Sequence, residues 1–215
     1  MSQQSEHRFK LNLPSADFTF VLGSSSKSRA LVLNKHQISY EVAVAEIDEK
    51  AIGDRDLDQP AELVLRIANA KADALIASGK LDALAPAIVV CCDQVAVYKG
   101  RIREKPENEA QAREYLTSYR TAPVETYGGV VVYNTLTGKR AATVDIAKQH
   151  FKFIPDDVID ALVALGRVYS CAGGFTIEDP LLVPYLGDTE GEDGGWDSIV
   201  GLSLTVVQRL IEQTK

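Results

Sequence analysis

The sequence predicts an α/β protein built on a mixed, twisted sheet flanked by helices. Segments with helical spacing of apolar residues alternate with β runs, but without the strict strand–helix–strand rhythm of an all-parallel sheet. Residues 87–98, AIVVCCDQVAVY, form a continuous apolar run of the kind that a central strand covered on both faces requires. Residues 125–153 indicate a long β ribbon that turns at Thr137-Gly138, which we expect to elaborate the sheet.

The first predicted unit is a strand, a serine turn and a helix. Residues 1–17 are polar and aperiodic, so we expect a flexible N-terminal extension followed by a single domain over residues 18–215. The strand, residues 18–22, stops at Gly23. The serines that follow offer an N-cap to a helix whose apolar residues begin at Ala30.

A second β run is predicted over residues 38–50, with acidic side chains gathered at its C-terminal end. The next segment has helical spacing and runs from Pro60 to Gly79, and these residue types are typical of the two ends of a helix. The spacing places Lys71 on the apolar stripe of this helix, four residues from an apolar neighbour on each side.

The rest of the chain continues the alternation. A turn and a short return strand are predicted over residues 99–106, and a helix follows over residues 108–119 with its first residue as the cap. Further helices are predicted over residues 155–166 and 206–213. The acidic, glycine-rich residues 192–197 read as an exposed loop, in which the tryptophan could form a contact surface.

Composition and charge narrow the class of function. The 215 residues are 46% hydrophobic and 25% charged, which excludes collagen-like, coiled-coil and disordered chains. A net charge of −7 disfavours nucleic acid and anionic membranes as partners, so an anionic substrate needs a local basic cluster or a metal ion. No apolar run approaches the ~18 residues of a membrane span and no signal peptide is evident, so we expect a cytoplasmic protein. Three cysteines, two of them adjacent, fit neither a disulfide framework nor a zinc site.

Three positions stand out by their local chemistry. Ser24 and Ser26 lead from a strand into a helix whose free N–H groups suit a phosphate, and Arg29 could add a bidentate contact; a plain helix cap is the alternative. Lys71 must either extend its ammonium to the rim or face a polar site. Asp93 interrupts the central apolar run, where an unpaired carboxylate would be costly, and this favours a site at the sheet.

Other residues carry weaker signals. The acidic residues at 46–49 could supply a carboxylate to a divalent ion, because Mg²⁺ takes oxygen ligands and commonly one or two protein carboxylates beside phosphate. A solvated strand end is the alternative. Lys105 is uninformative by itself. Cys171 beside glycines invites a cysteine-nucleophile hypothesis, which the scattered histidines disfavour.

Taken in order, these pieces resemble the Maf family, also described as septum-formation-inhibitor-like nucleoside triphosphate pyrophosphatases. The resemblance runs from about Phe20 to Leu210 and rests on seven motifs in order. They are SSSKSR with Lys27 in place of a proline, Asp48-Glu49, IANAKA with Lys71, Asp93-Gln94-Val95, EKP with Lys105, CAGGF, and VGLSL with Ser203 in place of a proline.

The resemblance implies two lobes with a cleft between them, and hydrolysis of a nucleoside triphosphate to the monophosphate and pyrophosphate. It places Asp93 at the proton-accepting position and Glu49 at an acidic position associated with metal and catalysis. Both are therefore candidate ligands of a divalent cation, Mg²⁺ or alternatively Mn²⁺. The expected substrate-binding residues are Ser24, Ser26, Arg29, Lys71 and Lys105. The implied partner is a small-molecule nucleoside triphosphate, and a homodimer is compatible with the resemblance.

The family divides into a branch that prefers dTTP and UTP and a branch that prefers 7-methyl-GTP. CDQV and CAGGFTIE resemble the second branch and place Gln94 and Glu178 at its specificity positions. A carboxylate can accept two hydrogen bonds from the guanine N1–H and exocyclic amine. The third specificity position of that branch is a tryptophan suited to stacking on a cationic base, and here it is Ser28. Trp196, the one tryptophan of the chain, could supply such a ring from elsewhere.

We therefore expect a metal-dependent pyrophosphatase that clears modified or non-standard nucleotides such as 7-methyl-GTP. One alternative is a dTTP/UTP pyrophosphatase of the same family. Another is a non-catalytic, nucleotide-binding regulator of cell division. The joint presence of the two carboxylates Asp93 and Glu49 with Lys71 and Lys105 argues for catalysis, because a binding protein does not need the proton acceptor.

Overall fold

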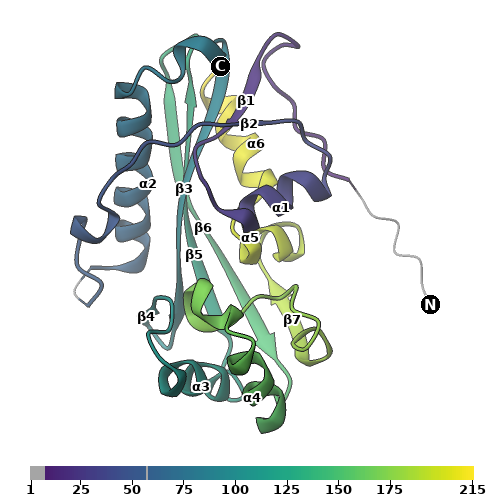
Figure 1. Ribbon diagram of the computed structural model, residues 1–215. Coiled ribbons are helices and arrows are strands. Elements are labelled where there is room, and N and C mark those ends of the chain that lie inside the picture. Colours follow the sequence, from purple (N-terminus) through teal and green to yellow (C-terminus); the bar gives the residue numbers. More distant parts are fainter. Residues whose placement is uncertain (1–7, 57) are drawn as a thin grey trace.

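The computed structural model describes residues 8–56 and 58–215, except for the side chain of Asp193, and within them one mixed sheet carries the fold (Figure 1). The sheet order is β2–β1–β3–β5–β6–β7, and β4 pairs with β3. The strands are β1 (Thr19–Leu22), β2 (Glu41–Val42), β3 (Ala87–Tyr98), β4 (Arg101–Arg103), β5 (Val124–Asn134), β6 (Arg140–Phe151) and β7 (Leu186–Glu190). The α-helices are α1 (Lys27–Lys35), α2 (Pro60–Ala77), α3 (Glu109–Ser118), α4 (Asp156–Ala164), α5 (Trp196–Val200) and α6 (Leu204–Gln213). The predicted mixed α/β fold class is confirmed.

Strand β3 is the centre of the sheet and has two different edges. One edge pairs antiparallel with β5 along nearly its whole length. On the other edge, residues 87–90 pair parallel with β1 and residues 96–98 pair antiparallel with β4. Among the described strands, none pairs with residues 91–95 on that second edge. Asp93 and Gln94 therefore lie at a gap in the sheet, where a ligand can approach the strand.

Helices cover the two faces of the upper half of the sheet (Figure 1). On one face, Ala68, Ala72 and Leu75 of α2 pack in a cluster with Val89 of β3 and Val131 of β5. Helices α1, α5 and α6 cover the other face, within the largest apolar cluster of the structure. Each fully buried valine or leucine side chain contributes about 1.5–3 kcal/mol, so packing on both faces holds the central strands in place.

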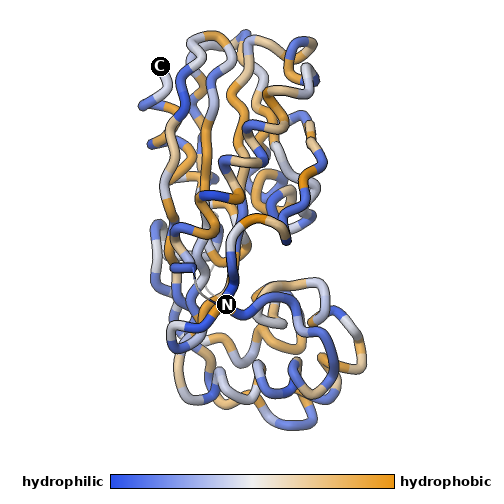
Figure 2. Tube along the Cα trace, turned by 90° about the vertical axis from the view of Figure 1, so that its left-hand side faces the viewer, coloured by the Kyte–Doolittle hydropathy of each residue, from blue (hydrophilic) through white to orange (hydrophobic). Residues whose placement is uncertain are grey.

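The lower half forms a second lobe, and strands β3, β5 and β6 extend into it (Figures 1 and 2). Helices α3 and α4 belong to this lobe, where the rings of Tyr119, Phe151 and Phe175 lie with their centroids 5.6 Å apart in each pair. Ring pairs at this separation and in these orientations stabilise beyond their buried area. The long strands thereby join the two expected lobes, and the largest apolar cluster, which includes Tyr119 and Phe175, continues from the upper half into the lower lobe.

Gly129 of β5 sets how closely α2 approaches the sheet. It lies opposite Asp93 in the β3–β5 register. A Cβ atom at this position would lie 2.3 Å from the backbone oxygen of Val64 in α2, which is closer than packed atoms tolerate. The absence of a side chain therefore lets α2 sit directly over β5, and this height brings Lys71, two turns further along the helix, to the level of the gap in the sheet.

Three segments differ from the prediction. The β run expected over residues 38–50 is wrong for most of its length, because only Glu41–Val42 pairs with β1, at the exposed edge of the sheet, and the chain then leaves the sheet. Strand β7 and helix α5, both in the region beyond residue 185, were not predicted. The sequence of β7, LGDTE, is mostly polar, and this strand exists because β6 offers it a pairing edge. Helix α5, WDSIV, has only five residues, too few for helical spacing to show in the sequence.

The N-terminal residues that the structure describes lie on the body of the protein. Residues 8–17 contain no helix or strand, yet Phe9, Leu11 and Leu13 pack against the main apolar cluster. The Phe9 N–H donates to His36 Nδ1 at 2.9 Å. Residues 8–17 of the expected extension thus have packing contacts, residues 1–7 lie outside the described part, and the flexibility of the extension stays a prediction. No described helix is long and apolar enough to cross a membrane.

Candidate active site

A cleft of about 870 Å³ opens beside the gap in the sheet. It is lined by the turn between β1 and α1, the loop before α2, the middle of β3, the segment after β4, and residues 170–178 of the lower lobe. All of the site residues predicted from the sequence line this cleft. They are Ser24, Ser26, Ser28, Arg29, Glu49, Lys71, Asp93, Gln94, Lys105 and Glu178. The structure thus brings the whole set together, and the roles of its members stay predictions.

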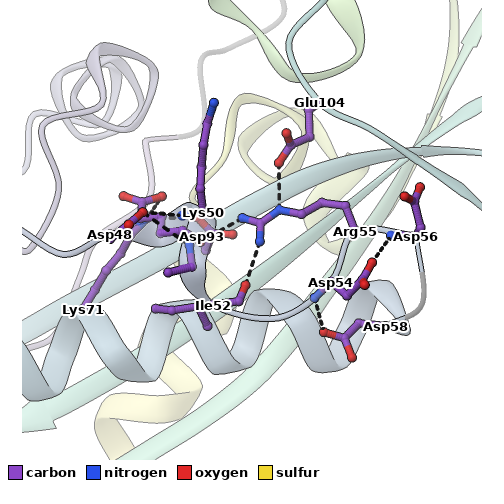
Figure 3. Close-up of polar contacts among 12 residues, drawn as sticks. Asp48, Lys50, Ile52, Asp54, Arg55, Asp56, Asp58, Lys71, Asp93 and Glu104 are labelled. Carbon is purple, nitrogen blue, oxygen red and sulfur yellow. Dashed lines mark hydrogen bonds and ion pairs between the residues drawn. The ribbon is translucent and has the colours of Figure 1, made fainter.

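Lys71 is the centre of the polar contacts in the cleft (Figure 3). Its Nζ lies 2.9 Å from Asp93 Oδ1, 3.0 Å from Glu49 Oε2 and 3.4 Å from the carbonyl oxygen of Cys92. An ammonium has three N–H donors, and here three oxygens surround it. Of the two alternatives for Lys71, the structure therefore supports the polar site over the solvent-exposed rim, since the side chain is only 14% exposed.

The two carboxylates around Lys71 differ in their surroundings. The Asp93 side chain is 12% exposed and projects from the rigid central strand. The Glu49 side chain is 48% exposed and belongs to a short 3₁₀ turn, Glu49–Ala51, in the loop before α2. Asp48 caps that turn, because its Oδ1 accepts from the N–H groups of Lys50 and Ala51. Asp93 is thus fixed by the sheet, whereas Glu49 depends on its loop.

The serine turn between β1 and α1 orients the side chain of Arg29. Ser26 caps α1 through its Oγ and the N–H of Arg29. Ser24 Oγ accepts from Arg29 Nη1 at 2.8 Å, and the Arg29 Nε–H donates to the carbonyl of Gly201 at 3.1 Å. The guanidinium is therefore oriented before any ligand binds. Together with the positive N-terminal end of α1, it gives the upper wall of the cleft an affinity for anions.

The predicted specificity residues lie at the same cleft. Gln94 Nε2 donates to the carbonyl of Ser198 in α5 at 2.8 Å, which fixes the orientation of its side-chain amide. Burial raises the pKa of the Glu178 carboxyl above its ordinary value, and a backbone hydrogen bond opposes this shift. Trp196 does not supply the ring that Ser28 lacks. It is not among the described residues that line the cleft, and Lys35 Nζ lies 3.4 Å from its ring centroid.

Lys105 and Cys171 also line the cleft, but only Lys105 is suited to bind a ligand. Lys105 is exposed at the wall formed by the segment after β4, and among the described residues it has no hydrogen bond or ion pair. Its ammonium is therefore available to a ligand. Burial raises the pKa of the Cys171 thiol, so this side chain stays protonated at neutral pH and is a poor nucleophile. The rejection of a cysteine hydrolase agrees with this environment.

The cleft is mixed in charge rather than basic. The described residues that line it include six cationic side chains, Lys27, Arg29, Lys50, Arg55, Lys71 and Lys105, and six acidic ones, Asp48, Glu49, Asp93, Glu104, Glu107 and Glu178. The positive and negative charges balance, so the cleft has little excess positive charge with which to neutralise a polyanion. A ligand of that kind needs an additional cation.

The donor set fits a divalent cation that is completed by its ligand. Glu49 and Asp93 contact the same ammonium, so their carboxylates converge on one region of the cleft. Among the described residues, no group of three or more His, Cys, Asp and Glu side chains could hold a metal ion alone. Mg²⁺ commonly binds through one or two carboxylates and the phosphates of a substrate, and Glu49 and Asp93 supply two converging carboxylates.

Sequence reasoning missed Arg55 and Glu104, which also line the cleft (Figure 3). Arg55 Nε donates to Glu104 Oε1 at 3.0 Å, although 49 positions separate the two residues. Nothing in the local sequence pairs them. The only signal was indirect, because Glu104 precedes Lys105 in the EKP motif and Arg55 follows the acidic pair by a few residues.

Comparison with known proteins places these features in a family. A family model described as "Maf-like protein" matches residues 19–214. A 7-methyl-GTP pyrophosphatase of Dictyostelium discoideum is 44% identical over 198 residues, which cover 90% of this chain and 95% of the relative. A 7-methyl-GTP pyrophosphatase of Nitrosococcus oceani is 32% identical, with 94% and 97% covered. A nucleoside triphosphate pyrophosphatase of Salinispora tropica is 32% identical, with 90% and 82% covered. With a match over nearly its whole length, the chain belongs to the Maf family.

Proposed function

We propose that this protein hydrolyses a nucleoside triphosphate to the nucleoside monophosphate and pyrophosphate in the cleft. The observation that carries the proposal is the placement of Lys71 between Asp93 and Glu49, at a gap in the sheet. This arrangement combines a proton acceptor, a phosphate-binding cation and two carboxylates for a metal ion within one cleft. The names of the three relatives, which are all pyrophosphatases of nucleoside triphosphates, support the same reaction.

The triphosphate would bind along the cations of the cleft. Arg29 is already oriented by Ser24 and Gly201, so little side-chain entropy is lost when it contacts a phosphate. The N-terminal end of α1 adds a positive dipole end. Lys105, which has no partner among the described residues, would reach the phosphates from the segment after β4. These groups would hold the substrate with its α-phosphorus near Asp93.

Asp93 would accept the proton of the attacking water. Its Oδ1 accepts from Lys71, which leaves the second oxygen for the water. The water attacks the α-phosphorus, the bond to the bridging oxygen breaks, and pyrophosphate leaves. Lys71 and Arg29 would stabilise the charge that develops on the phosphate oxygens, since preorganised donors act strongly in a shielded cleft.

A divalent cation is part of this proposal, with Mg²⁺ as the expected ion and Mn²⁺ as the alternative. Glu49 and Asp93 are the residues that would hold it. When bound, it would neutralise phosphate charge that the balanced cleft leaves uncompensated.

For the base, we propose a guanine nucleotide of the 7-methyl-GTP type. Glu178 can accept from the N1–H and exocyclic amine of guanine, and Gln94, which lines the same cleft, is anchored by the carbonyl of Ser198. Two of the relatives are named for this substrate, including the relative at 44% identity. A role in clearing modified nucleotides, a cytoplasmic location and a homodimer remain predictions of the same proposal.

Pyrophosphate release tests the proposal directly. The purified protein is assayed with Mg²⁺ and 7-methyl-GTP, GTP, UTP, dTTP and CTP, and each reaction is repeated with a chelator. We expect 7-methyl-GTP to be hydrolysed with the highest kcat/KM and the chelator to abolish release. Preference for UTP or dTTP would contradict the assignment of Gln94 and Glu178 to guanine. Failure to release pyrophosphate from any triphosphate, with nucleotide binding retained, would favour the non-catalytic regulator.

A further inference from the structure

The guanidinium of Arg55 makes three hydrogen bonds, although the residue lies in an irregular loop (Figure 3). Its Nη1 donates to the carbonyl of Ile52 at 2.6 Å and its Nη2 to the carbonyl of Glu49 at 2.9 Å. Its Nε donates to Glu104 Oε1 at 3.0 Å. All three nitrogens of the guanidinium are therefore engaged, and its side chain is 22% exposed. A planar group held by three acceptors has a fixed position.

The contact with Glu49 is made at the backbone, on the residue that carries one of the two candidate metal-binding carboxylates. Glu49 lies in the stretch between β2 and α2, and none of the described residues of this stretch belongs to a strand of the sheet. Its own side chain has one ion pair, to Lys71, and is about half exposed. Ordering such a loop costs conformational entropy, so contacts that fix its backbone decide how often Glu49 faces the cleft.

The contact with Glu104 joins this loop to the other side of the site. Glu104 directly precedes Lys105, and its carbonyl accepts from the N–H of Gly173 at 3.1 Å, so its segment is itself anchored to the lower lobe. Through one side chain, Arg55 thus connects the segment of Glu49 with the segment of Lys105. The alignment of two site residues that lie far apart in sequence depends on this connection.

We propose that Arg55 is a positioning residue that acts through Glu49: it holds the loop so that the Glu49 carboxylate reaches Lys71 and the cleft. This inference rests on the proposed function of Glu49. The competing idea is that Arg55 contacts the triphosphate itself. The geometry favours positioning, because each guanidinium nitrogen already donates to an acceptor of this chain, two of them backbone carbonyls that cannot turn away without unfolding the turn.

A double-mutant cycle between Arg55→Ala and Glu49→Gln tests the inference. Residues that act as one unit couple, so we expect Arg55→Ala to lower kcat/KM by about 10- to 100-fold in the native protein but by less than about 3-fold in the Glu49→Gln background. Arg55→Lys should be intermediate, since an ammonium is a compact point charge and lacks the planar fork of donors that spans these three acceptors. Arg66→Ala is the matched control, because Arg66 pairs with Asp58 near the same loop and does not line the cleft.

Two further readouts separate positioning from substrate contact. Hydrogen exchange of residues 46–52 should accelerate in Arg55→Ala and not in Arg66→Ala, whose effect reaches this loop only at the Asp54 N–H, through Asp58. Glu104→Ala should lower kcat/KM if Arg55 positions the loop. It should instead lower the KM of the triphosphate if Glu104 merely competes with phosphate for Arg55.

The outcomes distinguish this inference from the function on which it rests. An equal loss from Arg55→Ala in both backgrounds, or a lower KM in Glu104→Ala, would overturn the positioning role while leaving the pyrophosphatase intact. Absence of pyrophosphate release from the native protein would overturn both. If Arg55→Ala unfolds, Arg55→Lys and Glu104→Ala still test the positioning role, since the first retains Glu104 and a cation at position 55 and the second retains Arg55.

Discussion

Asp93→Asn separates the proposed chemistry of Asp93 from its structural role. The asparagine oxygen can still accept from Lys71, which also keeps its ion pair with Glu49. Replacing a charged acceptor by a neutral one at a side chain that is 12% exposed should cost about 1 kcal/mol of unfolding free energy. For a chain of this length, that corresponds to a fall in Tm of about 2–4 °C. The variant should therefore fold.

Turnover should fall far more than stability. An amide cannot accept the proton of the attacking water, and general-base catalysis of this kind contributes about 10²–10⁴-fold to the rate. At saturating Mg²⁺ we expect kcat to fall by that factor and KM to change much less than kcat, because Arg29, Lys71 and Lys105 still bind the phosphates and Glu49 still offers a carboxylate to the metal ion. The assay is pyrophosphate release at saturating triphosphate with Mg²⁺, beside thermal unfolding of the same preparations.

Asp145→Asn provides the matched control. Asp145 lies in β6 and is as deeply buried as Asp93, but it does not line the cleft. Its substitution should leave turnover nearly unchanged. If Asp93→Asn kept more than about a tenth of the native turnover, the expected loss of ~10²–10⁴-fold would be wrong, and Asp93 would not be the proton acceptor. If both variants lost turnover alike, the loss would report a disturbed sheet.

Two other predictions follow from the same geometry. Burial raises the pKa of Glu178, so this carboxyl protonates at a higher pH than an exposed glutamate. The KM of guanine triphosphates should therefore rise as the pH falls toward that pKa, whereas the KM of UTP, measured in parallel, should not. Glu178→Gln should abolish this pH dependence. Gly129→Ala should lower the unfolding free energy by about 1–3 kcal/mol and reduce kcat, because its Cβ would push α2 and Lys71 away. Gly128→Ala, whose Cβ would meet nothing closer than 3.7 Å, should change neither quantity in urea unfolding and activity assays.

How well the sequence predicts an interaction depends on how far apart in the chain the interacting residues lie. Asn108 and Ser26 cap their helices as local patterns indicate, because a cap involves residues three positions apart. The β run over residues 38–50 failed for the opposite reason. Its alternation suits a strand, but a strand also needs a neighbour, and only Glu41–Val42 has one.

For the candidate site, the sequence identified residues and the fold supplied their relations. Lys71 on an apolar stripe and Asp93 inside an apolar strand were recognisable because each is costly where it stands unless it meets a partner. That each is a partner of the other, across 22 positions, was not visible locally. The same holds for Trp196, whose place against Lys35 rather than in the cleft depends on how α5 packs on α1.

The sequence by itself determined the central strand, most of the helices, the order of the motifs and thereby the family. Only the tertiary structure decided which oxygens surround Lys71, which carbonyls orient Arg29 and Gln94, and that Arg55 meets Glu104. These contacts join residues 172, 104 and 49 positions apart for Arg29, Gln94 and Arg55 respectively. Periodicity and capping act within a few residues, whereas such contacts depend on how closely helices and strands pack, as the bare backbone of Gly129 beneath α2 illustrates.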